Sequence, residues 1–146
     1  MEAPDYAVML LARREYSRAE LKERMARRDY APEHIEAVLD DLSERGLQSD
    51  ERFAEMFVRS RILRRQGARR ISMDLNMRGV EQHIVQRVLA EADVDWFALA
   101  CEALAARFKA PADDFKAKAR QQRFLASRGF DAAQCWHALE YAWQDE

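Results

Sequence analysis

Apolar side chains recur along the chain at spacings of three and four residues. One such set, at positions i, i+3, i+4 and i+7, consists of Ile35, Val38, Leu39 and Leu42. The same spacing returns in the stretch 85–92. This period places the apolar residues on one face of an α-helix. The pattern therefore predicts amphipathic helices and an all-α protein.

The apolar pattern also repeats every fifty residues. Aligning the chain with itself at this offset gives six columns of similar, mostly apolar residues without a gap. These columns hold Leu21, Ile71 and Gln121; Met25, Leu75 and Leu125; Tyr30, Val80 and Phe130; Ile35, Val85 and Cys135; Val38, Val88 and Ala138; and Leu39, Leu89 and Leu139. We therefore predict three copies of one helical unit, at residues 1–47, 48–93 and 94–146.

Helix ends fall at matching places in the three units. The segments "RDYAP" (28–32), "RGVEQ" (78–82) and "RGFDA" (128–132) each follow a helical stretch, and glycine there can adopt the left-handed conformation that stops a helix. In the first segment Asp29 stands where the other two have glycine. The glycine position is therefore predicted to be a helix stop in all three units.

Helix starts are signalled by capping residues. Ser17 with Glu20 forms a capping-box pattern, Ser49 or Asp50 can cap the first helix of the second unit, and Asp131 can cap the last helix. Starts and stops together predict three helices per unit. The last two helices, joined by a short turn, resemble a helix-turn-helix, a motif whose second helix can enter a DNA major groove.

A unit of about 50 residues buries too little apolar surface to be comfortably stable alone. Adjacent units should therefore pack on each other, as in other repeat proteins. We expect an elongated, curved array of three tandem three-helix repeats.

Composition supports helices and limits the function. The chain of 146 residues is 49% hydrophobic and 34% charged, with four glycines and three prolines, which favours helix over strand. It has no apolar run of 18 residues, and its first residues carry acids where a signal peptide is basic, so we expect a soluble, cytoplasmic protein. The net charge of −2 means that any nucleic-acid contact must come from a local basic patch.

Residues with catalytic or metal-binding chemistry are few. His34, His83 and His137 lack metal-ligand spacing, which favours surface or packing roles. Cys101 and Cys135 lie 34 positions apart, which indicates reduced, partly buried thiols. The sequence contains no Walker loop, GxGxxG or GxSxG motif. We therefore expect no enzymatic activity, no cofactor and no metal.

A run of arginines without an acid is the strongest candidate site. It holds Arg59, Arg61, Arg64, Arg65, Arg69 and Arg70. Helical geometry places Arg61 on the apolar face, which indicates a structural role, whereas Arg64 and Arg65 close one helix, where cations suit the dipole. Gly67 is expected to break that helix. Arg69 and Arg70 would then open the next one, where cations are unfavourable, and this favours a binding function.

Three further sets of residues have alternative interpretations. Lys118, Arg120 and Arg123, with Lys116, form a second basic stretch that is either part of the same groove or a solvated helix face. Met73 and Met77 lie beside Arg70 on the next helix and form either an adaptable contact surface or a contact with a neighbouring unit. The column Arg28, Arg78 and Arg128 recurs at helix ends, which favours a structural role.

Four segments have a specific character when taken together: "LARREYSRAELKERM", "LSERGLQSDERFAEMFVRSRI", "QGARRISMDLNMRGV" and "FLASRGF". Through them the chain resembles, over nearly its whole length, the RecX family of bacterial regulators of the RecA recombinase. The sequence departs from the family at Ala68, where we expect proline, and at Asp29, where we expect glycine.

The resemblance implies a protein, not itself an enzyme, that lodges in the groove of the RecA nucleoprotein filament. It would inhibit filament extension, ATPase and strand exchange, and so modulate recombination, DNA repair and the SOS response. For the oligomeric state, a monomer is the default expectation. The residues expected to supply the electrostatic attraction, with weak DNA contact in addition, are Arg59, Arg64, Arg65, Arg69, Arg70, Lys118, Arg120 and Arg123. Two alternatives remain: a regulator that binds DNA directly through helix-turn-helix-like units, and a scaffold for helical partners.

Overall fold

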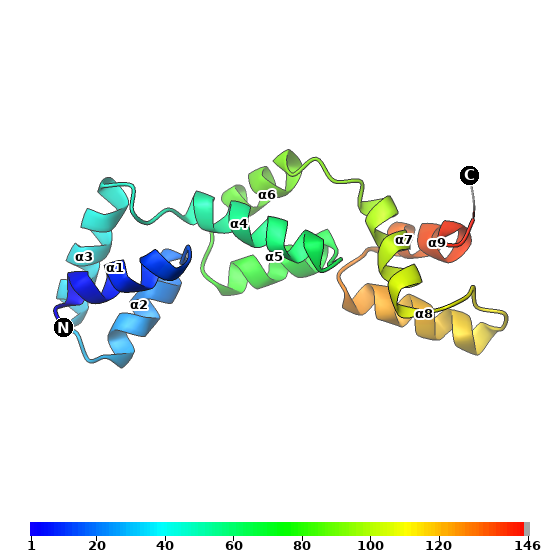
Figure 1. Ribbon diagram of the computed structural model, residues 1–146, viewed down its shortest axis with the longest axis horizontal. Coiled ribbons are helices and arrows are strands. Elements are labelled where there is room, and N and C mark those ends of the chain that lie inside the picture. Colours follow the sequence, from blue (N-terminus) through cyan, green and yellow to red (C-terminus); the bar gives the residue numbers. More distant parts are fainter. Residues whose placement is uncertain (145–146) are drawn as a thin grey trace. The chain divides into compact units, whose positions relative to one another are not determined.

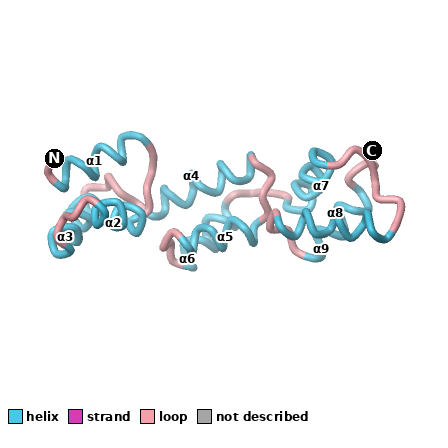
Figure 2. Tube along the Cα trace, turned by 90° about the horizontal axis from the view of Figure 1, so that it is seen from below, coloured by secondary structure: helices cyan, strands magenta, loops and turns pink. Residues whose placement is uncertain are grey.

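In the computed structural model, which describes residues 1–144, every regular element is an α-helix (Figures 1 and 2). The helices are α1 (Ala3–Arg13), α2 (Arg18–Arg27), α3 (Pro32–Glu44), α4 (Asp50–Leu63), α5 (Ala68–Met77), α6 (Gln82–Glu91), α7 (Trp96–Arg107), α8 (Phe115–Ser127) and α9 (Ala132–Tyr141). The predicted all-α fold with three helices per repeat is confirmed. No helix in the described range is long and apolar enough to cross a membrane.

The predicted caps fix where several helices begin. Ser17 and Asp131 each accept a hydrogen bond from the backbone three residues further on and form complete capping boxes. The hydroxyl of Ser49 accepts a backbone hydrogen bond at 3.1 Å in the first turn of α4. Asp50 accepts the backbone N–H of Arg18 instead, at 2.9 Å. Ser49 is therefore the side-chain cap of α4.

The left-handed helix stops are also confirmed, with one correction. Asp29, Gly79 and Gly129 have φ angles of 63°, 82° and 102°. The prediction that Gly67 breaks the helix was wrong, because α4 already ends at Leu63 and the left-handed residue is Arg65, with a φ of 58°. Gly67 is needed for a close backbone contact instead.

The helices group into two compact units. The first contains Met1–Phe57 and Leu75–Val88, and the second contains Val58–Asp74 and the chain from Leu89 onward. In the first unit α1, α2 and α3 pack around fully buried residues such as Leu21 and Met25. In the second, α7, α8 and α9 enclose a core that the last turn of α4 also contacts through Ile62. The predicted curvature of the array stays a prediction.

A contact between consecutive repeats, which we term the joint, occurs once in each unit. In the second unit the backbone N–H groups of Gly67 and Arg69 donate to the carbonyls of Arg128 and Gly129, at 2.7 and 3.1 Å. In the first unit the hydroxyl of Ser17 donates to the carbonyl of the residue at 78, at 2.8 Å. Positions 17 and 67, and positions 78 and 128, are fifty residues apart. The expected packing of neighbouring repeats therefore uses equivalent positions of the repeat at both joints, with a hydroxyl donor at one and backbone donors at the other.

The recurring arginine column has the predicted structural role. The Arg128 guanidinium donates to the carbonyl of Arg64 across the joint, and Arg78 pairs with Glu20 at 3.3 Å. Arg28 lies at the turn of the first repeat, which forms no joint among the described residues. Its guanidinium carbon lies 4.5 Å from the centre of the Tyr6 ring.

The two methionines of α5 are solvent-exposed. The exposed fraction is 54% for Met73 and 80% for Met77. This exposure favours the contact-surface interpretation over packing against a neighbouring repeat.

Gln121 occupies an apolar column but is polar and buried. Its Nε2 donates to the carbonyl of Ala110 at 3.1 Å, while its Oε1 has no hydrogen-bond partner among the described residues. Since Ala110 is exposed, a water molecule can donate to its carbonyl when the amide of Gln121 is removed. We expect Gln121→Leu to raise the melting temperature by about 2–4 °C, because an unsatisfied buried oxygen is removed. Circular dichroism melting checks this, with exposed Gln86→Leu as a control that should change little; a lower melting temperature for Gln121→Leu would contradict it.

Candidate functional site

All eight basic residues predicted as the site lie in the second unit, and all are exposed. Arg59 lies on α4, Arg64 and Arg65 follow α4, Arg69 and Arg70 are in the first turn of α5, and Lys118, Arg120 and Arg123 are on α8. The sequence of this unit contains 13 Lys and Arg residues against 11 Asp and Glu residues, whereas the first unit contains 11 against 15. The net charge of −2 is therefore the sum of one basic and one acidic unit.

The two units also differ in how their cations are paired. In the first unit most arginines are held by carboxylates; Arg18, for example, contacts Glu36 and Asp40 at 2.8 Å each, and Arg52 contacts Glu15 at 2.7 Å. In the second unit, within residues 58–74 and 89–144, Arg70 is the one predicted site residue that forms an ion pair, with Asp74 at 3.3 Å, and Arg61 contacts the same acid. Most of the predicted site residues therefore have no carboxylate within 4.0 Å in the described chain.

Asp74 binds two arginines of the basic run. Arg61 contacts its carboxylate at 2.6 Å and also donates to Gln66 at 2.8 Å, and the exposed fraction of the Arg61 side chain is 13%. Arg70 contacts the same carboxylate at 3.3 Å. Burial raises the pKa of Asp74, but hydrogen bonds and charge from Arg61 and Arg70 outweigh it and hold the pKa below its ordinary value. Arg61 is therefore structural, as its position on the apolar face predicts.

The joint brings the arginine run to the end of α8. Arg70 donates to the carbonyl of Ser127 at 3.1 Å, and Arg128 reaches the carbonyl of Arg64. Burial, together with the charges of Arg70 and Arg61, lowers the pKa of Arg128. The lowered pKa therefore reflects first the burial of Arg128 and then the two positive charges that lie near it at this joint.

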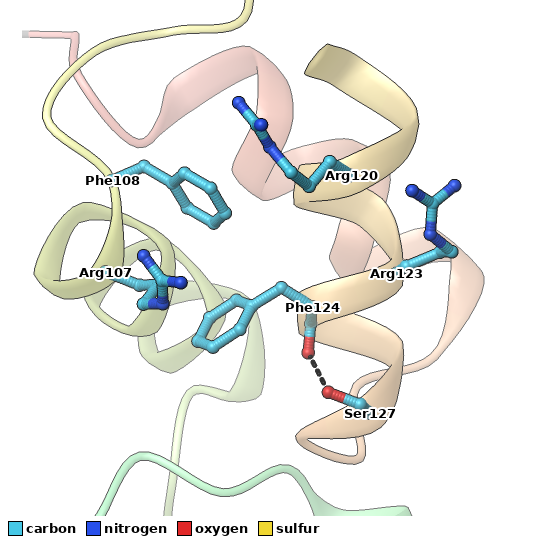
Figure 3. A pocket seen from close by; sticks show the side chains of 6 residues that line it. All are labelled: Arg107, Phe108, Arg120, Arg123, Phe124 and Ser127. Carbon is cyan, nitrogen blue, oxygen red and sulfur yellow. Dashed lines mark hydrogen bonds between the residues drawn. The ribbon is translucent and has the colours of Figure 1, made fainter. Parts of the chain in front are cut away.

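The residues of α8 divide between two sides of the helix. Arg120 and Arg123 line an open cleft of about 560 Å³ together with Arg107, Phe108, Phe124 and Ser127 (Figure 3). Lys118 instead lies 5.8 Å from the ring of Trp136 on α9. An adjoining cleft contains Lys116 with Arg120 and Arg123. Lys118 is therefore separated from Arg120 and Arg123, with which it was predicted to form a group. Lys116 lies with these two arginines instead.

Sequence reasoning missed Arg107 and Phe108. Arg107 is the last residue of α7 and Phe108 follows it, eight or nine positions before the basic stretch of α8 begins and on the other side of a loop, so helical spacing alone did not connect them. The available signal was the pairing of a cation with an aromatic residue in both places: Arg107 directly precedes Phe108, and Arg120 precedes Phe124 by one helical turn.

The third helix of each repeat is poorly suited to a DNA major groove. In a helix-turn-helix this helix would contact bases and phosphates. Helices α3 and α9 contain no Lys or Arg, and α6 contains only Arg87. α3 instead carries five acidic residues. The helix-turn-helix resemblance therefore reflects packing geometry and does not place positive charge where duplex DNA needs it.

Groups suited to covalent or metal chemistry are not assembled in the described range. No cluster of three or more His, Cys, Asp or Glu residues in residues 1–144 has the geometry to hold a metal ion. Cys101 and Cys135 are free thiols whose pKa values burial raises, which makes them poor nucleophiles. The chemistry that this surface supports is binding of anionic groups.

Tandem three-helix domains, one unit of which carries a basic and largely unpaired surface, define an α-helical repeat protein. The sequence matches the RecX first three-helix domain at residues 3–42, the second at 49–89 and the third at 93–139. The chain belongs to the RecX family. The exact repeat boundaries at 1–47, 48–93 and 94–146 stay predictions.

Curated relatives and solved structures share this family. The chain is 52% identical to the regulatory protein RecX of Chromohalobacter salexigens, over 97% of this chain and 93% of the relative, and 46% identical to that of Halorhodospira halophila, over 97% and 89%. A RecX crystal structure from Lactobacillus salivarius covers 96% of this chain and 94% of its own, with a TM-score of 0.76 at 19% identity. A second RecX crystal structure gives a TM-score of 0.81 at 18% identity and covers 93% of this chain and 69% of its own. These structures support the fold.

Proposed function

We propose that this protein binds the RecA filament on DNA and inhibits its extension, ATPase and strand-exchange activities. It would act as a cytoplasmic monomer in recombination and DNA repair. The observation that carries the proposal is membership of the RecX family, whose curated relatives are named regulatory proteins over nearly the full length of this chain. The family resemblance supplies RecA as the partner.

The second unit supplies a surface suited to such a filament. Arg64 and Arg69 lie beside one joint, are exposed and have no carboxylate within 4.0 Å in the described chain. Arg120 and Arg123 lie on α8, which ends at the same joint. Unpaired arginines attract both acidic protein surfaces and DNA phosphates. We assign filament attraction to this group, with Arg59, Arg65, Arg70 and Lys118.

The experiment that tests the proposal is a titration of RecA ATPase on single-stranded DNA with this protein. Inhibition at much less than one copy per RecA supports blocked filament growth. Inhibition only near saturation supports occupancy of the groove. An unchanged ATPase rate at saturating protein would overturn the proposal.

Reversing two unpaired charges should weaken inhibition without unfolding the protein. For Arg64→Glu/Arg69→Glu we expect the half-inhibiting concentration to rise about tenfold at low salt, because attraction to an anionic filament becomes repulsion. Stability should change little, since both side chains are exposed and an acid at 69 suits the start of α5.

The matched control for this double variant is Arg13→Glu/Arg24→Glu, which changes charge equally on exposed positions of the first unit. It should inhibit as the wild-type protein does. Equal loss in both double variants would show that total charge, and not this surface, controls binding. Normal inhibition by Arg64→Glu/Arg69→Glu would remove these residues from the site.

A direct DNA-binding function remains the second candidate, and the basic cleft with aromatic side chains at the end of α7 favours it. A DNA regulator should bind bare DNA tightly, with an affinity that falls steeply as salt rises. A filament binder should associate much more tightly with DNA that carries RecA than with the same DNA bare. Binding measured with and without RecA across a salt series separates the two.

A further inference from the structure

The cleft between the end of α7 and the face of α8 combines aromatic rings with cations. The rings of Phe108 and Phe124 meet edge to face, with centres 5.6 Å apart and planes at 83°. The guanidinium carbons of Arg107 and Arg120 lie 5.1 and 6.0 Å from the centre of the Phe108 ring. Figure 3 shows both rings facing the open space, with these two arginines beside them. One aromatic pair is thus flanked by two cations.

The cations of this cleft are not neutralised by the protein. Arg107, Arg120 and Arg123 are exposed and have no carboxylate within 4.0 Å in residues 1–144. The acid of the adjoining cleft, Asp114, accepts the backbone N–H of Ala117 at 2.7 Å as the cap of α8. Its charge is therefore directed at the helix end.

The positive charge continues along α8 beyond the aromatic pair. Lys116, Arg120 and Arg123 share the adjoining cleft, of about 290 Å³. At 1.5 Å per residue, they span about 10 Å of helix axis. This length suits more than one phosphate group of a single strand.

We infer that this cleft binds a single-stranded polynucleotide, with an unpaired base against Phe108 and Phe124 and the flanking phosphates at Arg107, Arg120 and Arg123. Single-strand sites of other proteins combine these two features, a positive track for the backbone and aromatic faces for the bases. Arginine suits this role because its planar fork bonds phosphate oxygens while its flat face stacks on rings.

The aromatic pair decides between the possible anionic ligands. In duplex DNA every base is already stacked, so only the phosphates can reach the arginines, and the third helices that could enter a major groove hold few cations. An acidic peptide would neutralise the arginines but has no base to place on the rings. A single strand satisfies both features of the cleft.

The inference goes beyond RecA inhibition because the contact needs no RecA. It shares Arg120 and Arg123 with the surface proposed for the filament but adds Arg107, Phe108 and Phe124. The two proposals therefore fail separately. Loss of bare-strand binding tests the cleft, whereas RecA ATPase tests inhibition.

The first test uses the wild-type protein without RecA. Fluorescence anisotropy compares an oligo-dT of about 15 nucleotides with an abasic strand and a duplex of the same length. We expect the strand with bases to bind about tenfold more tightly than the abasic strand, since the phosphates are the same and only stacking differs. An oligo-rU of the same length is expected to bind as well, because the contacts described involve phosphate and base. Equal affinity for dT and abasic strands would overturn the stacking role.

The second test uses variants of the cleft. Arg107→Gln/Arg120→Gln should reduce the slope of log affinity against log salt by about 1.4, because a single strand loses about 0.7 per phosphate contact. Arg13→Gln/Arg24→Gln is the control on the first unit and should leave the slope unchanged. Phe108→Leu should keep the slope but bind the dT and abasic strands with nearly the same affinity.

Three results would overturn the inference. The first is that the wild-type protein does not bind single strands. The second is that Arg107→Gln/Arg120→Gln binds single strands as the wild type does. The third is that this variant binds the RecA filament more weakly while its binding to a bare strand stays intact. The last result would assign the cleft to an acidic protein surface. If the cleft variants lose single-strand binding while RecA ATPase is never inhibited by the wild type, the inference stands and the proposed function fails.

Discussion

Gly67→Ala is expected to lower the free energy of unfolding by about 3 kcal/mol and the melting temperature by about 10 °C. A Cβ at this position would lie 2.4 Å from the carbonyl carbon and oxygen of Gly129 and 2.6 Å from the nitrogen of Phe130. These are backbone atoms, so no side chain can move aside. Relief requires the joint to open and its hydrogen bonds at Gly67 and Arg69 to lengthen or break.

The measurement is urea unfolding followed by circular dichroism, with hydrogen exchange of the Gly67 and Arg69 amides as a local probe. Gly46→Ala is the matched control, because Gly46 has a φ of 72° but nothing within 4 Å of an added Cβ. It should lose only about 1 kcal/mol, from backbone strain. Equal losses in the two variants would show that the close contact at the joint contributes nothing.

Arg61→Ala is expected to destabilise the second unit by about 2 kcal/mol. The substitution removes a contact of 2.6 Å to Asp74 and the hydrogen bond to Gln66, a residue that is itself buried. Asp74 would keep only the longer contact of 3.3 Å to the more exposed Arg70. The loss exceeds that of a surface ion pair because the carboxylate and Gln66 stay largely out of water.

The pH dependence of stability gives a second readout of this pair. The folded protein holds the pKa of Asp74 below its unfolded value, so the contribution is full above the unfolded pKa and is lost as pH falls through the folded pKa. Wild-type stability should therefore decline below about pH 4, and part of that decline should be absent in Arg61→Ala. Unfolding curves between neutral pH and acid measure it. Parallel declines in both proteins would contradict the assignment.

Much of the fold could be predicted because helix signals are local. Ser17 and Asp131 cap helices through bonds to residues three positions away, and the left-handed stops at Gly79 and Gly129 need only their own backbone. The fifty-residue repeat in addition predicted that the chain contains three such units. Gly67 was misread because its role depends on Gly129, sixty-two positions away, and composition cannot reveal a close approach of two backbone segments.

The candidate site was only partly predictable for the same reason. Helical periodicity placed Arg61 on the apolar face and marked the exposed run around it. It could not show that Arg70 would donate a hydrogen bond to the carbonyl of Ser127. Nor could it show that Arg107 and Phe108 would line a cleft with residues of α8. Within α8, the prediction placed Lys118 and Arg120 on one surface because both belong to the same run of charges. Two residues that are two positions apart lie on nearly opposite sides of an α-helix, so they do not share a surface.

Asp29 has a consequence for self-assembly. At both joints the turn residue must be glycine, since a Cβ at Gly79 would lie 2.5 Å from Ala19 and one at Gly129 would lie 2.3 Å from Arg70. The first repeat has the same turn, and there an aspartate side chain stands in the place where a further helix start would have to dock. A tandem repeat whose joint is copied along the chain could otherwise extend from molecule to molecule into an open polymer. We expect the side chain of Asp29 to obstruct that addition, so that the repetition within the molecule does not continue between molecules.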